Sequence, residues 1–388
     1  MLALRLTRGA HPFVLCGRLL VAAASAGTGF LMLSALSHAL AHPGAGGALL
    51  RLAWCVVPLT ATVYFAVAMA RNDPATRPRE GLSSVGLGPA ALAGLAAAST
   101  ALSSLLGSVV ALLFFLHLRG DLTGLPFDGA AAGMLAADQP LPLAAVLTLL
   151  AIVPAVASLA TAVALRPRAG RPAPTAPRTE PPTPLPVPSG LPWGVALLAT
   201  GLAVESWAGG TSRDGGVPLP GGVESGALGG VLGWLLTALG LALAGPGLTH
   251  LCGRVLQSAK PGAVRLLAGR GLQEEATRIG RPVGVVCAVA SGALASATLY
   301  GAGTGTSPAG PLTALGGVLV AGCALATLLS AGVEARRSRA SANAALLRLG
   351  APASALRNAA ALRAVTLIAV FVPLTWAVAT LAAAPLRG

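Results

Sequence analysis

Few residues of this chain have a type and spacing that could do chemistry. His38 and His42 are four positions apart, so on a helix they would share one face and could hold a metal ion, but no third ligand accompanies them. Asp121, Asp128 and Asp138 are the acids that an acid–base site would need, and they are too widely spaced to define one. No H-E-x-x-H or G-x-S-x-G motif occurs. The sequence therefore predicts no catalytic, cofactor-binding or metal-binding site, and no enzyme activity.

Nucleotide binding is also not expected of this chain. A P-loop needs a lysine at the end of a glycine-rich loop, and the one lysine, Lys260, lies in QSAKPGA, which is not such a loop. The cysteines form no C-x-x-C pair, which argues against a zinc knuckle or a disulfide framework. We expect them to be small buried apolar side chains. They are Cys16, Cys55, Cys252, Cys287 and Cys323.

The elements that carry these residues are long apolar runs. Crossing a bilayer takes roughly 20 apolar helical residues, and the mean hydropathy of the chain is +0.78 with 10% charged residues. Runs of this kind lie near 13–40, 50–70, 87–117, 141–165, 191–207, 224–247, 282–303, 310–333 and 359–383. Because backbone groups in lipid must be paired internally, the runs are predicted to be helical. The fold class is an all-α polytopic transmembrane bundle of about nine spans.

Glycine is abundant in these runs, with 50 in the chain. Small residues let membrane helices approach closely. A genome rich in G and C would also produce an excess of Ala and Gly, so both explanations stay open. The glycines placed where helices could meet are Gly94, Gly107, Gly229, Gly230 and Gly240.

Arginines between the runs predict the orientation. The formal net charge is +14, and short Arg-rich loops stay in the cytoplasm; we attribute the charge to topology and expect no nucleic-acid binding. The N-terminus and the segments 71–86, 166–190, 248–281 and 334–358 are then cytoplasmic. The chain is predicted to be a multi-pass protein of the cell membrane.

Composition also divides the chain. Residues 1–165 form a first membrane module of four spans, and 166–190 form a Pro-rich cytoplasmic linker. Residues 191–250 form a central span pair. Residues 251–388 form a second membrane module, preceded by a cytoplasmic amphipathic segment that Pro261 interrupts.

Two of the cytoplasmic segments resemble one another. The first runs from Arg79-Glu80 to Leu87-Gly88, and the second runs from Ser341 to Leu349-Gly350. Each follows an incoming span, ends in Leu-Gly and leads directly into an outgoing span. The spacing suggests a short helix that ends at a glycine, followed by a re-entering helix.

These two segments resemble the coupling helices of the FtsX-like permease family of ABC transporters, which includes the MacB-type and bacitracin-exporter-type membrane subunits. The resemblance implies two FtsX-like modules and cytoplasmic contacts to a separate ATPase. The coupling residues that it implies are Arg79, Glu80, Leu87, Gly88, Arg337, Arg339, Leu346, Leu347, Arg348, Leu349 and Gly350. The chain departs from the family pattern at Val85 and Ala342, lacks a tenth span, and has no large extracytoplasmic domain.

The expected function is therefore a permease subunit that works with a separate ABC ATPase to move or extract a hydrophobic or amphiphilic substrate. Membrane lipid is a further expected partner, and a homodimer is left open. Two alternatives remain: a membrane scaffold or decayed permease without transport activity, and a membrane-embedded lipid-modifying enzyme. The enzyme would have to use the aspartates of the loop 118–140.

Overall fold

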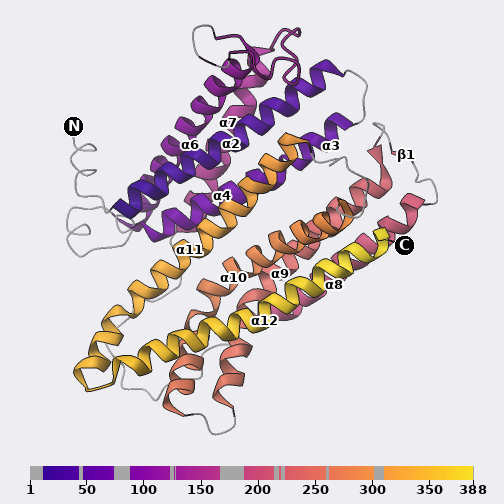
Figure 1. The fold of residues 1–388 in the computed structure, drawn as a ribbon. Helices are drawn as coiled ribbons and strands as arrows, with labels where there is room; N and C mark the ends of the chain where they lie inside the picture. The colour runs from indigo at the N-terminus through magenta and orange to yellow at the C-terminus, as the bar shows by residue number, and fades with distance from the viewer. Residues whose placement is uncertain are drawn as a thin grey trace. The chain divides into compact units, whose positions relative to one another are not determined.

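The computed structural model describes residues 12–42, 47–73, 88–122, 126, 128–166, 188–213, 218–219, 223–258, 262–300 and 310–387 (Figure 1). Within these ranges, nine helices are long and apolar enough to cross a membrane, which confirms the predicted all-α polytopic fold. The helices are α2 (Pro12–Ala41), α3 (Gly47–Trp54), α4 (Val56–Asn72), α6 (Pro89–Arg119), α7 (Leu143–Leu165), α8 (Gly190–Arg213), α9 (Ser225–Gln257), α10 (Ala263–Tyr300), α11 (Pro311–Arg348) and α12 (Ala353–Arg387). Strands β1 (Pro218–Leu219) and β2 (Val223–Glu224) pair antiparallel between α8 and α9.

The chain folds as two compact units. Unit 1 comprises Met1–Pro172 and Ala309–Thr327, and unit 2 comprises Ala173–Pro308 and Leu328–Gly388. Helix α11 therefore contributes its first part to unit 1 and its second part to unit 2. The module boundaries expected from the sequence, and their relation to the FtsX-like plan, stay a prediction.

Unit 1 is built around α2, which packs against α4, α6 and α7. Interhelical hydrogen bonds hold it there: Ser25 Oγ donates to Ser104 O on α6 at 2.9 Å, and the Thr28 and Thr62 hydroxyls lie 2.9 Å apart between α2 and α4. A Cβ at Gly107 would overlap the Ala22 carbonyl oxygen, so the α2 and α6 backbones touch. Close backbone contact and interhelical hydrogen bonds of hydroxyl groups stabilise helix packing in lipid, where burial of apolar side chains alone contributes little free energy.

Unit 2 uses glycine contacts more extensively, between α8 and α9 and between α9 and α10. A Cβ at Gly240 on α9 would lie 2.8 Å from Gly194 O on α8, and a Cβ at Gly194 would lie 2.8 Å from Gly240 O. On the other side of α9, Gly245 meets the backbone of Gly280 on α10. The small residues thus set the helix spacing.

The glycines singled out from the sequence divide into two groups. Gly107, Gly229 and Gly240 lie at close helix contacts, as predicted, whereas a Cβ at Gly94 or Gly230 would meet nothing within 4 Å. Four of the five cysteines are buried and Cys16 is exposed, and all five are free thiols. The expectation of buried apolar cysteines is therefore wrong only for Cys16.

The last helices are longer than their apolar runs. Helix α11 has 38 residues, a length of about 57 Å against roughly 30 Å of hydrocarbon. The described residues of the predicted surface segment at 251–281 complete α9 up to Gln257 and begin α10 at Ala263. Cys252 and Leu256 pack with Ala268 and Leu272 in one buried cluster, and the location of this segment on the membrane surface stays a prediction.

Candidate functional site

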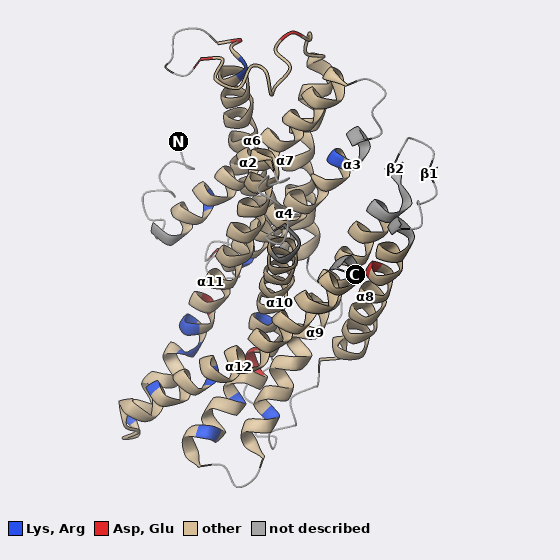
Figure 2. Cartoon of the chain, turned by 45° about the vertical axis from the view of Figure 1, so that its right-hand side comes forward, with Lys and Arg blue, Asp and Glu red and all other residues tan. Residues whose placement is uncertain are grey.

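The second of the two similar segments forms the polar end of α11. Residues 311–333 carry no charge, whereas 334–348 hold Glu334 and four arginines. These 15 residues continue the helix for about 22 Å at 1.5 Å per residue. Figure 2 shows that in unit 2 the basic residues gather at the joined end of α11 and α12 and near the joined end of α9 and α10. We call residues 334–348 the α11 extension.

A sharp turn at Gly350 ends the α11 extension. Gly350 has φ +88°, its N–H donates to Leu347 O at 3.1 Å, and the N–H of Ala351 donates to Leu346 O at 3.0 Å. These two bonds with a left-handed residue are a Schellman motif, which requires the conformational freedom of glycine. Pro352 follows, and α12 begins at Ala353. The predicted helix end at this glycine is confirmed, whereas the predicted short helix is not a separate element, because residues 341–348 are the last part of the continuous helix α11.

The turn exposes apolar side chains. Leu349 is 84% exposed and Leu347 is 48% exposed, while Leu346 is half-buried and Arg348 is exposed. We call residues 346–350 the α11–α12 tip. Leucines this exposed, in the charged part of a helix rather than in its apolar run, form a surface suited to contact with another molecule.

The α11 extension is fixed to α10 by an ion pair. Arg339 Nε lies 2.6 Å from Glu275 Oε1, and Glu275 is 8% exposed. Arg339 Nε also donates to Ala335 O of its own helix. Arg339 is therefore engaged within the chain. Arg337 is exposed on the same extension and also takes part in an interaction of its own.

A second contact joins α10 to α12. A Cβ at Gly271 would lie 2.6 Å from Arg363 Nη1, so the guanidinium rests on the α10 backbone. Arg363 Nε donates to Ala359 O at 3.2 Å. Sequence reasoning missed Glu275 and Gly271 as members of this site. Their spacing of four residues, which places them on one face of α10, was the signal available.

Of the first of the two similar segments, 79–88, the structure describes only Gly88. Arg79, Glu80 and Leu87 lie outside the described residues. Gly88 is the N-cap of α6 with φ −67° and ψ 165°, an extended conformation that any residue adopts. Pro89 explains this geometry, because proline suits the first turn of a helix and favours an extended preceding residue. Gly88 thus starts a helix, whereas Gly350 ends one.

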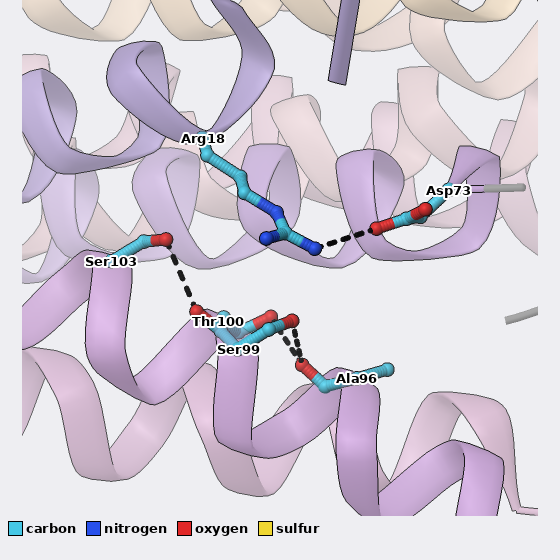
Figure 3. Close-up of polar contacts among 6 residues, drawn as sticks. All are labelled: Arg18, Asp73, Ala96, Ser99, Thr100 and Ser103. Carbon is cyan, nitrogen blue, oxygen red and sulfur yellow. Dashed lines mark hydrogen bonds and ion pairs between the residues drawn. The ribbon is translucent and has the colours of Figure 1, made fainter. Parts of the chain in front are cut away.

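Unit 1 contains a small polar pocket of its own (Figure 3). Arg18 on α2 pairs with Asp73 at the end of α4, with Nη2 and Oδ2 3.1 Å apart. Ser99, Thr100 and Ser103 of α6 line the same cavity of about 30 Å³, which has room for a water molecule. Their hydroxyls donate to carbonyl oxygens of α6 itself.

The other residues considered for chemistry do not converge. Asp121, Asp128 and Asp138 are all exposed, and Asp121 pairs with Arg119 at 3.2 Å. The rings of His38 and His42 stack with centroids 4.5 Å apart. In the described part of the chain, no group of three or more His, Cys, Asp and Glu side chains could hold a metal ion.

No protein-family model, curated protein or solved structure matches this chain. Its candidate site is thus defined by its own residues: the α11–α12 tip, the Arg339–Glu275 pair and the Arg363–Gly271 contact.

We predict different effects on stability for alanine substitutions at Gly350 and Gly88, although a Cβ at either position would meet no neighbouring atom within 4 Å. Gly350→Ala is expected to cost about 1 kcal/mol because alanine is strained at positive φ. Gly88→Ala is expected to change stability by less than about 0.5 kcal/mol, since its backbone is extended. Unfolding of the purified variants in mixed detergent–SDS micelles measures both. Equal losses at the two positions would show that the left-handed turn does not govern the effect.

The Arg339–Glu275 pair is expected to contribute a coupling free energy of about 1–2 kcal/mol, because Glu275 is buried and its partner is only partly exposed. A double-mutant cycle of Arg339→Gln and Glu275→Gln, with unfolding as the readout, measures this energy. The exposed pair Arg270–Glu274, separated by 3.4 Å on one face of α10, provides the matched control, with an expected coupling below about 0.5 kcal/mol. A coupling free energy for Arg339–Glu275 that is no larger than that for Arg270–Glu274 would contradict the prediction.

Proposed function

We propose that this polytopic membrane protein is the permease subunit of an FtsX-like ABC transporter. A separate ATPase docks on the α11–α12 tip and supplies the energy of ATP hydrolysis. The observation that carries the proposal is the pair of exposed leucines, Leu347 and Leu349, on a Schellman turn at the end of a helix longer than the bilayer is thick.

The side chains of the tip suit a protein partner. Leu347 and Leu349 offer apolar anchors, which contribute most when a partner pocket removes them from water. Arg348 lies between these leucines, and Arg336 and Arg337 add exposed positive charge farther back on the α11 extension. Such a rim favours an acidic groove and accelerates association with it.

The contacts behind the tip would transmit movement. The Arg339–Glu275 pair joins α11 to α10, and the Arg363–Gly271 contact joins α10 to α12. A displacement of the tip would therefore be passed to three helices at once. In this proposal Arg339 positions the coupling segment, while Arg337 and Arg348 contact the partner.

The first segment supplies a second contact in the proposal, through Arg79, Glu80, Leu87 and Gly88. The arginine distribution supports placing both segments in the cytoplasm. The loops proposed to face the other side, 41–49 and 303–310, are short. We therefore propose that the substrate is hydrophobic or amphiphilic and enters from the membrane.

Purification of the tagged chain from its native membrane tests the proposal. We expect a stoichiometric P-loop ATPase to co-purify and the complex to hydrolyse ATP, with nucleotide bound by the partner alone. Purification of the chain without an ATPase would favour the decayed permease or scaffold. Saturable ATP binding by the isolated chain would contradict the assignment of roles.

A further inference from the structure

Glu205 is a buried carboxyl in an apolar helix. It is the one charged residue in the span Gly190–Gly210 of α8, and it is 9% exposed. Among the described residues, neither of its carboxylate oxygens has a hydrogen-bond partner. An acid in this setting needs a physical explanation, because unpaired charge inside a membrane costs several kcal/mol.

The close contact of α8 with α9 places the side chain. Gly233 of α9 lies opposite, so near that a Cβ there would be 2.6 Å from Glu205 Cγ and 2.9 Å from Gly201 O. One turn farther along α9, the Thr237 hydroxyl is also buried and faces the Glu205 carboxyl. A carboxyl and a hydroxyl thus occupy one seam between two helices whose backbones are in contact.

The helices packed against α8 bring no charge within their apolar stretches. Helix α8 packs against α9 and α12. Residues 225–249 of α9 and 364–386 of α12 contain no charged residue. The charged residues nearest to the seam along the chain are Arg213, Asp214 and Glu224.

An ionised carboxylate and a neutral carboxylic acid differ greatly in such a seam. The ion loses its hydration, whereas the neutral acid loses only the hydrogen bonds of a polar group and can donate one O–H. A proton is also small enough to bind between helices that touch. Larger cations would need the backbones to part.

We propose that Glu205 is a proton-binding site within the membrane, neutral at neutral pH while α8 and α9 are packed together. When the helices separate and water reaches the seam, the Glu205 O–H bond breaks, the proton passes to water and the carboxylate remains. When the helices close, one proton is taken up from water. This site does not depend on the proposed ATPase partner, and it links one proton to one movement of unit 2.

Infrared spectroscopy of the full chain in lipid nanodiscs tests the site, because a protonated carboxylic acid has a C=O stretch that a carboxylate lacks. At neutral pH, we expect the band in the unmodified protein, its loss in Glu205→Gln, and its retention in Glu274→Gln, whose acid is exposed. The C=O band of the protonated acid is also expected to remain in Arg213→Gln. Unfolding measurements on Glu205→Gln verify that the isosteric change preserves the fold.

Two results would overturn the proposal. The first is a spectrum at neutral pH that is the same with and without the Glu205 carboxyl. The second is a band that appears only in Arg213→Gln, which would show that Glu205 is ionised and paired. As a second readout, dicyclohexylcarbodiimide, which adds to protonated carboxyls in apolar surroundings, is expected to modify Glu205, and the modification is expected to be lost in Glu205→Gln.

Discussion

Replacing Leu347 and Leu349 together by Asp is expected to prevent the proposed ATPase partner from co-purifying with the chain, while membrane insertion stays normal. The two side chains are exposed in the chain by itself, so the change should hardly affect folding. In the complex they would be buried, and two unpaired carboxylates in their place should weaken binding at least about 100-fold, or about 3 kcal/mol. Titration of the ATPase onto nanodisc-reconstituted variants measures the loss.

A control with the same chemistry separates apolar anchoring from charge. Leu349→Asp and Ser341→Asp each add one negative charge to the same end of α11, and both positions are exposed. We expect the leucine variant to lose most of the affinity and the serine variant to lose less than about tenfold, the effect of a rim charge. Unchanged binding after replacement of both leucines would eliminate the tip as the docking surface.

Gly240→Leu is expected to have the largest effect on folding, destabilising unit 2 by about 3 kcal/mol. Even a Cβ at this position would lie 2.5 Å from Leu198 N and 2.8 Å from Gly194 O. Because both atoms belong to the α8 backbone, a larger side chain must force the helices apart, which is the costly form of overpacking. Unfolding in mixed detergent–SDS micelles gives the change in free energy.

Gly230 of the same helix is the control, since a Cβ there would meet nothing within 4 Å. Gly230→Ala should be neutral or stabilise the protein by up to about 1 kcal/mol, because alanine favours helix more than glycine does. Gly240→Ala should destabilise it. Effects of the same sign at both positions would show that glycine abundance, rather than helix contact, explains these residues.

The apolar runs predicted the nine candidate spans of the described residues because their signal is local. Each run is long enough to span a bilayer, so hydropathy identifies it without knowledge of its neighbours. The end of α9 at Gln257 and the beginning of α10 at Ala263 were harder to predict. Their mixed pattern does not specify their neighbours, and the buried cluster that they form with Ala359 joins residues far apart in the sequence.

The site was predictable to a lesser degree. The Leu-Gly ending at Gly350 correctly predicted a helix end, since the left-handed turn is encoded by adjacent residues. The same pattern misled at Gly88, where Pro89 dictates a helix start instead. The partnership of Arg339 with Glu275 joins residues 64 positions apart, and nothing in either local sequence specifies it. Glu205 was visible as a rare charge near a span end, but its unpaired state depends on the packing of α9.

Photo-crosslinking from position 349 tests the central claim most directly. A benzophenone amino acid replaces Leu349 at the tip, and in a matched variant it replaces Leu159, which is also largely exposed but lies within the apolar span of α7. After irradiation of native membranes, we predict a covalent adduct between position 349 and a P-loop ATPase, and lipid adducts alone from position 159. Lipid adducts alone from position 349 as well would contradict the proposed docking of an ATPase on this chain.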